Sequence, residues 1–160
     1  MTGPARLLAA ADPTALDQAV DLLARGEVVA IPTETVYGLA GASTMPDAIA
    51  RIYATKGRPS HNPLISHVSG IAMAERYVRF DDRSRALAEA FWPGPLTLVL
   101  PLLPGSGIDP ASTAGGATAA IRAPRGFAHQ LIARLDLPLA VPSANRSGRI
   151  SPTCAEHVMA

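Results

Sequence analysis

The spacing of apolar residues predicts alternating helices and strands along the chain. Leucine and valine recur at helical spacing from 16 to 23, behind a capping box Thr14-x-x-Asp17, and Gly26 ends this helix. We expect strands at 28–31, 63–68, 96–102, 118–122 and 139–141, and further helices from 43–46 to 57, at 71–78, 83–91 and 127–135, and from 153 onward. This pattern predicts one α/β domain over residues 1–160, with a mixed sheet because some connections are too short for crossover helices.

The segment IPTETVYGLA, residues 31–40, is unusually polar for the end of a strand. A surface turn usually uses glycine, asparagine or aspartate, whereas Thr33, Thr35 and Tyr37 are stiff side chains that prefer extended backbone. Their tips can all form hydrogen bonds. We therefore interpret this segment as a rigid wall of a binding site.

Composition limits the classes of protein that remain. The chain is 48% hydrophobic over 160 residues, which suffices for one core. Fourteen Lys and Arg against thirteen Asp and Glu give a net charge of +1, so no general attraction to nucleic acid is expected. Cys154 is the single cysteine, which excludes an internal disulfide framework. The apolar run at 95–103 is interrupted by Pro101 and is far shorter than the roughly 20 residues of a membrane helix. We expect a cytoplasmic protein that does not bind membranes.

Four polar loops are candidates for chemistry, at 33–37, 56–67, 118–122 and 143–151. In an open α/β sheet such loops meet in the crevice beyond the strand ends. Lys56-x-Arg58 lies on a loop pinned by Pro59 and Pro63. The two cations could clamp a polyphosphate, or the segment could be an ordinary solvated basic loop. The run VPSANRSG at 141–148 allows close approach of a ligand to the backbone, or forms a simple turn.

Two further residues have both a functional and a structural interpretation. His67 ends a predicted strand, where a histidine is more often structural, and Arg122 ends another, where a buried anion partner would explain it. We assign no role to the remaining histidines or to the cysteine. The sequence contains no P-loop, no GxGxxG, no HExxH and no paired CxxC. The residues alone therefore predict an α/β domain with a cleft for a small anion or a nucleotide.

Five segments together carry a resemblance to a known family. They are PTETVYGLA, the loop KGRPSHNPL at 56–64, PGPLT at 93–97, the strand that ends at Arg122, and PSANRSG at 142–148. Their order and spacing, over roughly residues 16–153, resemble the YrdC-like family of threonylcarbamoyl-adenylate synthases. The resemblance implies a twisted mixed open sheet, flanked by helices, with a basic cavity on one side.

The implied activity converts L-threonine, bicarbonate and ATP, with Mg²⁺, into threonylcarbamoyl-AMP and pyrophosphate. A partner transferase would then modify the tRNA adenosine next to the anticodon. The nucleotide site implied by the resemblance comprises Lys56, Arg58, Asn62, Thr118, Ser143, Asn145 and Ser151. The implied threonine site comprises Thr35, His67 and Arg122. Lys56 and Arg58 are the predicted catalytic residues, and no resident metal site is expected. Removing either cation is expected to abolish turnover and to leave the melting temperature nearly unchanged.

Two departures from the family pattern, and several alternatives, accompany this prediction. Val141 stands where many relatives carry threonine, and relatives continue beyond Ala160, so we expect the chain to lack a C-terminal part. One alternative is a double-stranded RNA-binding module, which the near-neutral charge disfavours, although weak tRNA or double-stranded RNA binding stays open. Others are a carbamoyl-adenylate domain related to hydrogenase maturation and a catalytically silent paralogue.

Overall fold

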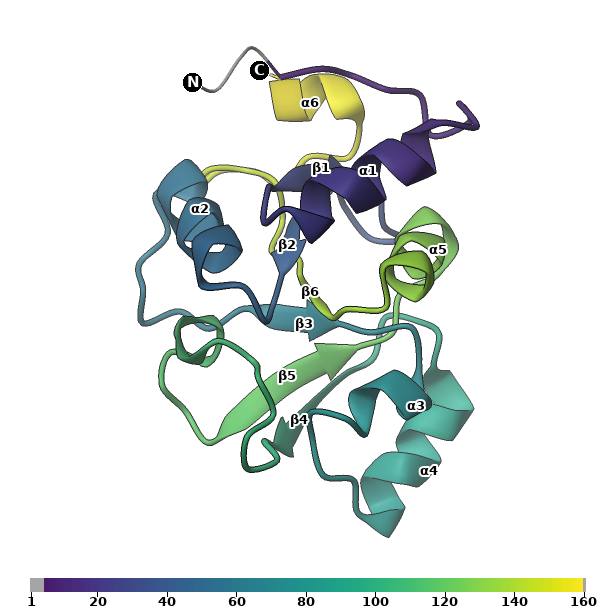
Figure 1. Cartoon of the computed structure of the whole chain (residues 1–160), viewed down its shortest axis with the longest axis vertical. Helices are drawn as coiled ribbons and strands as arrows, with labels where there is room; N and C mark the ends of the chain where they lie inside the picture. Colours follow the sequence, from purple (N-terminus) through teal and green to yellow (C-terminus); the bar gives the residue numbers. More distant parts are fainter. Residues whose placement is uncertain (1–4, 160) are drawn as a thin grey trace.

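The computed structural model describes residues 5–159 and contains a mixed sheet of six strands. Its strands are β1 (Val29–Ile31), β2 (Gly38–Ala42), β3 (Ile65–His67), β4 (Thr97–Pro101), β5 (Thr118–Arg122) and β6 (Leu139–Ala140). Their spatial order is β1-β2-β6-β3-β5-β4 (Figure 1). Within this sheet β3 and β5 run parallel, and the other neighbouring pairs run antiparallel. The predicted mixed α/β sheet is confirmed.

Helices flank this sheet. They are α1 (Ala15–Ala24), α2 (Pro46–Lys56), α3 (Ile71–Ala74), α4 (Asp82–Phe91), α5 (Gly126–Leu135), α6 (Ala155–Met159) and the short 3-10 helix η1 (Pro110–Thr113). Helix α1 contacts α5 and β2, α2 contacts β2 and η1, and α3 contacts α4. In Figure 1, α3 and α4 lie beside β4 and β5, whereas α2 lies at the other end of the sheet.

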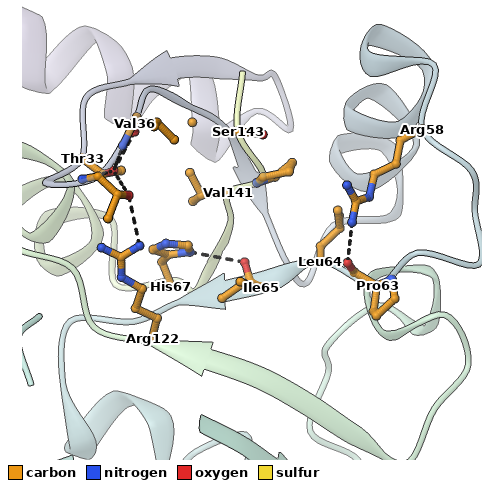
Figure 2. A pocket seen from close by; sticks show the side chains of 13 residues that line it. Thr33, Val36, Arg58, Pro63, Leu64, Ile65, His67, Arg122, Val141 and Ser143 are labelled. Atoms are coloured by element: carbon orange, nitrogen blue, oxygen red, sulfur yellow. Dashed lines mark hydrogen bonds between the residues drawn. The ribbon is translucent and has the colours of Figure 1, made fainter. Parts of the chain in front are cut away.

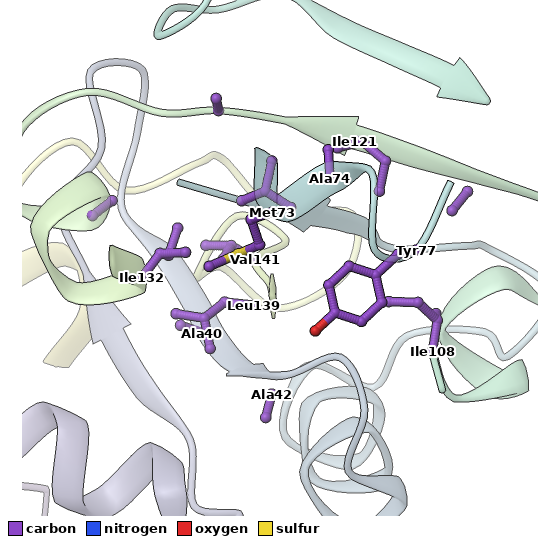
Figure 3. Packing of buried hydrophobic residues seen from close by; sticks show 14 of the residues in the cluster. Ala40, Ala42, Met73, Ala74, Tyr77, Ile108, Ile121, Ile132, Leu139 and Val141 are labelled. Carbon is purple, nitrogen blue, oxygen red and sulfur yellow. The ribbon is translucent and has the colours of Figure 1, made fainter. Parts of the chain in front are cut away.

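The two faces of the sheet are covered differently. Ala40 of β2, Ile121 of β5 and Leu139 of β6 belong to the main hydrophobic cluster, which also contains buried residues of α1, α3, α4 and α5 (Figure 3). The neighbouring residues in β2 and β6, Leu39 and Ala140, point to the opposite face and pack with two isoleucines of α2. Helix α2 contacts β2 on this side of the sheet.

One face of the strands β3, β5 and β4 is partly open. Ile65, Ala120 and Val99 are register partners across β3, β5 and β4, so their side chains share this face. Val99 is 66% exposed and Ile65 is 37% exposed. His67 and Arg122, each two residues further along β3 and β5, lie on the same face. The open face therefore presents a histidine and an arginine at the carboxyl ends of two parallel strands.

Strand β2 is an element that the hydrophobic pattern did not predict. Its sequence GLAGA contains no β-branched or aromatic residue, although all five residues are buried. Glycine is required there by packing, because a Cβ on Gly38 would overlap the side chain of Val141 and one on Gly41 would meet Ile52 of α2. Close approach of neighbouring side chains to the glycine backbone, which propensity does not report, explains this strand.

Two local predictions about helix ends were wrong. Thr14 makes no capping hydrogen bond, because its backbone is already helical and its hydroxyl donates to Asp12 at 2.8 Å. A capping box instead forms at α4, where Asp81 Oδ1 accepts from the Ser84 N–H at 2.7 Å and the Asp81 N–H donates to Ser84 Oγ at 2.9 Å. The helix expected over 71–78 ends at Ala74, and the chain that follows bonds to the end of β4.

Candidate active site

The segment between β1 and β2 is held in shape by its own hydroxyl groups. Thr33 Oγ1 accepts from the N–H groups of Thr35 at 3.2 Å and Val36 at 3.3 Å, and donates to the Val36 carbonyl at 2.6 Å. Tyr37 is fixed through its backbone, since its N–H donates to Pro152 and its carbonyl accepts from Ala144, each at 2.8 Å. Thr33 and Thr35 line a cavity, as expected of a wall, whereas Tyr37 serves to anchor the segment.

A cavity of about 320 Å³ lies between this segment, the open face of β3 and β5, and the loop after β6. Its lining consists of Thr33, Thr35, Val36, Gly38, Arg58, Pro63, Leu64, Ile65, His67, Arg122, Val141, Pro142 and Ser143. Figure 2 shows Arg122 and His67 at one end and Arg58 at the other. The size lies at the lower end of the range for small-molecule sites.

Three contacts hold the side chain of Arg122 in the cavity wall. It is buried, and its Nε donates to the Gly94 carbonyl at 3.2 Å while Nη1 donates to Thr35 Oγ1 at 3.4 Å. Its Nη2 forms an ion pair with Glu34 Oε1 at 2.9 Å. These contacts fix the plane of the guanidinium, which can then meet a carboxylate in a defined orientation. The sequence prediction missed Glu34, although it lies inside the polar segment.

His67 is buried beside Arg122, as the register of β3 and β5 requires. Burial, and then the neighbouring Arg122 guanidinium, lower the pKa of His67 from 6.5 to about 4, so its imidazole is neutral near neutral pH. Its Nδ1 lies 3.3 Å from the Ile65 carbonyl, which can only accept a hydrogen bond. Nδ1 therefore carries the proton, and Nε2 can accept a hydrogen bond from a ligand.

Lys56 and Arg58 have different surroundings despite their proximity in sequence. Lys56 is 3% exposed, and its Nζ donates to the carbonyls of Ser143 and Asn145. Lys56 does not belong to the cavity lining. Burial, and then Arg58, lower the pKa of Lys56. Arg58 lines the cavity while donating to the carbonyls of Asn62 at 3.2 Å and Pro63 at 3.0 Å. Lys56 thus connects the end of α2 to the loop after β6.

Other residues of the predicted nucleotide site lie outside the cavity lining, apart from Ser143, which belongs to it. Thr118 is exposed at the start of β5, at the opposite end of the strand from Arg122. Asn145 donates through Nδ2 to the carbonyls of Arg146 and Arg149, and its Oδ1 is buried without a hydrogen-bond partner among the described residues. Asn62 contributes its carbonyl to Arg58, and Ser151 is half-buried. The nucleotide contacts of these four residues stay predictions.

The three predicted threonine-site residues, in contrast, all line one cavity together with Arg58 and Ser143. Two arginines, a neutral histidine and threonine hydroxyls suit a small ligand that carries both a carboxylate and a hydroxyl. Among residues 5–159 there is no group of three or more His, Cys, Asp or Glu side chains that could hold a metal ion. No helix in the same range is long and apolar enough to cross a membrane. The site thus lies at the strand ends of an α/β domain, and its side chains suit a small anionic ligand.

Comparison with known proteins identifies the family. Residues 21–160 match the Sua5/YciO/YrdC family, whose description reads telomere recombination. The chain belongs to this family, and the resemblance to YrdC-like proteins found in the sequence is confirmed.

Individual relatives are similar over most of this chain. Threonylcarbamoyl-AMP synthase of Bacillus subtilis is 50% identical over 143 residues, which are 88% of this chain and 41% of the relative. The crystal structure of Pyrococcus abyssi Sua5 complexed with L-threonine superposes with a TM-score of 0.85 at 42% identity, over 89% of this chain and 42% of that one. Full-length HypF, in a phosphate- and nucleotide-bound form, shares the fold at 16% identity and a TM-score of 0.80, over 90% of this chain and 22% of that one. This chain thus spans less than half the length of these three proteins.

Proposed function

We propose that this domain forms threonylcarbamoyl-AMP and pyrophosphate from L-threonine, bicarbonate and ATP. The observation that carries the proposal is the meeting of Thr35, His67 and Arg122 in one cavity. A protein with the same fold, 42% identical over 89% of this chain, has been crystallised with L-threonine. Relatives named threonylcarbamoyl-AMP synthase favour this function over an RNA-binding module.

The cavity residues give threonine a defined orientation. Arg122 would bind the carboxylate through the terminal nitrogens of its fixed guanidinium. The side-chain hydroxyl of threonine would donate to Nε2 of His67, which is unprotonated, and would approach Thr35 on the facing wall. A site that pairs a substrate hydroxyl rejects analogues without it, because its own polar groups are then left unpaired.

The reaction needs positioning and charge stabilisation and involves no covalent protein intermediate. Threonine amine and bicarbonate form a carbamate with loss of water, and a carbamate oxygen attacks the α-phosphorus of ATP and displaces pyrophosphate. Positioning of the reactants can contribute roughly 7 kcal/mol or more. Loss of one key contact to the developing charge typically costs about 3 kcal/mol.

Arg58 and Lys56 are the cations that we assign to the phosphates. Arg58 lines the cavity at the end opposite Arg122, so a ligand that spans the cavity would meet both guanidinium groups. Lys56 uses two of its three N–H donors on backbone carbonyls, which leaves a third for a phosphate oxygen. It would therefore hold the loop that carries Ser143 and Asn145 and also contribute charge.

The remaining nucleotide contacts are assigned to Asn62, Thr118, Ser143, Asn145 and Ser151. The unpartnered Oδ1 of Asn145 supports this assignment, because a buried acceptor gains stability when a donor from a ligand reaches it. Mg²⁺ would enter as part of the ATP substrate, held by its phosphates. The protein contributes no cluster of acidic ligands within residues 5–159. The product would pass to a transferase that acts on tRNA, and we place the reaction in the cytoplasm.

Pyrophosphate release tests the proposal. ATP is incubated with the 160-residue chain, threonine and bicarbonate, and each of the two cosubstrates is omitted in turn. The proposal predicts release that requires both and that is lost in Arg122→Gln, which removes the charge but keeps hydrogen-bonding capacity. Release that persists without threonine would contradict it. Circular dichroism of the variant provides the control for folding.

A further inference from the structure

Glu34 has a position that the proposed reaction does not yet use. It lies between the cavity residues Thr33 and Thr35, and its side chain is 22% exposed. Its Oε1 pairs with Arg122 Nη2 at 2.9 Å and accepts from the Arg125 N–H at 3.3 Å. A carboxylate that contacts both Arg122 and Arg125 through Oε1 therefore stands next to the arginine that would bind the substrate carboxylate.

This arrangement is unfavourable for a simple anion. Nε of Arg122 is engaged by the Gly94 carbonyl, so an incoming carboxylate must use the Nη1 and Nη2 side of the guanidinium. Glu34 Oε1 already lies 2.9 Å from Nη2 as an ion pair, without a well-aligned hydrogen bond. A ligand that carries only a negative charge would either displace Glu34 or lie beside it, and both outcomes weaken binding through repulsion or loss of the ion pair.

An α-amino acid removes this conflict, because its ammonium and carboxylate groups are attached to the same carbon atom. We propose that Glu34 and Arg122 together recognise the zwitterion of the amino-acid substrate, Arg122 binding its carboxylate and Glu34 its ammonium group. One ion pair within the protein is then exchanged for two between protein and ligand. This inference rests on the proposed function and assigns Glu34 as a residue that determines specificity.

The charge state of Glu34 is consistent with this role. Burial by itself would raise the pKa of Glu34, but hydrogen bonds from a backbone N–H and from the Arg122 guanidinium outweigh it and lower the pKa. Glu34 is therefore a carboxylate near neutral pH, and a carboxyl group with a lowered pKa is a poor proton acceptor. It holds the ammonium group in place, and a different group or solvent takes the proton when the amine reacts.

Calorimetric titration of three proteins with two ligands tests the inference. The ligands are L-threonine and (R)-3-hydroxybutyrate, which is threonine without its amino group. The proteins are the unmodified chain, Glu34→Gln, and the control Glu27→Gln, which removes a carboxylate from the exposed pair with Arg51. We expect Glu34→Gln to weaken threonine binding about ten-fold, since a charge-assisted hydrogen bond is lost. The same variant should bind (R)-3-hydroxybutyrate more tightly than the unmodified chain, and Glu27→Gln should change neither affinity.

The ratio of the two affinities separates this role from a structural one. If Glu34 only orders the loop, Glu34→Gln lowers both affinities together and the ratio is unchanged, which would overturn the inference. The same conclusion follows if both ligands bind more tightly to the variant, because Glu34 would then be only a competitor for Arg122. Absence of threonine binding by the unmodified chain would instead contradict the proposed function itself.

Discussion

Replacing Lys56 by alanine removes the two hydrogen bonds that hold the loop after β6 against the end of α2. Both bonds are made by a charged donor that is 3% exposed, and their acceptors are the carbonyls of Ser143 and Asn145. Hydrogen bonds to charged groups contribute roughly 1.5–3 kcal/mol each, and relief from burying the ammonium group offsets part of this sum. We expect Lys56→Ala to lower the free energy of unfolding by about 3 kcal/mol.

A protein of this size loses about 2–4 °C in melting temperature per kcal/mol, so the expected decrease is about 6–12 °C. Thermal unfolding followed by circular dichroism measures it. Arg58→Ala is the matched control, because Arg58 bonds to carbonyls of its own loop and is only half-buried, and its effect should be near 1 kcal/mol. A melting temperature of Lys56→Ala equal to that of the control would refute the reasoning. The burial of Lys56 thus revises the expectation from sequence that its removal leaves stability unchanged.

Three further changes have defined outcomes. Thr35→Val should raise the KM for threonine about ten-fold and leave the KM for ATP unchanged, because a hydroxyl that faces Arg122 is lost. The pKa of His67 is lower in the folded state than in the unfolded chain. The neutral imidazole therefore stabilises the fold fully above about pH 6.5, and this stabilisation is lost as the pH falls toward about 4. The expected decrease in the free energy of unfolding is about 3 kcal/mol, and urea unfolding of His67→Gln at the same pH values should not show it. Gly38→Ala should destabilise the fold by about 1–3 kcal/mol through overlap with Val141, and adding Val141→Ala should restore part of the loss.

Each of these predictions has a result that would count against it. An equal rise in both KM values would remove Thr35 from the amino-acid site. Parallel pH profiles for the unmodified chain and His67→Gln would show that another group titrates. Additive destabilisation in the Gly38 and Val141 double variant would mean that the two side chains do not share the space assigned to them.

Local sequence signals predicted much of the fold. The strand 118–122 was predicted with the bounds that the structure shows. Helix α2 was predicted to end at Gly57, and it ends there because this glycine takes a left-handed conformation, at φ 57°. Strand β2 was not predictable from propensity, because Gly38 and Gly41 owe their place to neighbours distant in sequence, including Val141 and Ile52. Long-range packing, which periodicity does not encode, decides such elements.

The same distinction applies to the site. The polar tips of Thr33 and Thr35 and the resemblance carried by the motifs predicted a binding wall, and both residues line the cavity. The ion pair of Glu34 with Arg122, however, joins residues that are far apart in the chain, so only the folded structure reveals it. The burial of Lys56 likewise depends on carbonyls almost ninety positions away.

Detection of the product tests the central claim most directly. The 160-residue chain is incubated with ATP, threonine and isotopically labelled bicarbonate, and the reaction is analysed at once by mass spectrometry. The account predicts threonylcarbamoyl-AMP that contains one labelled carbon and forms in equal amount with pyrophosphate. Pyrophosphate or AMP without labelled adenylate would contradict it, because ATP would then be cleaved without transfer to the threonine carbamate.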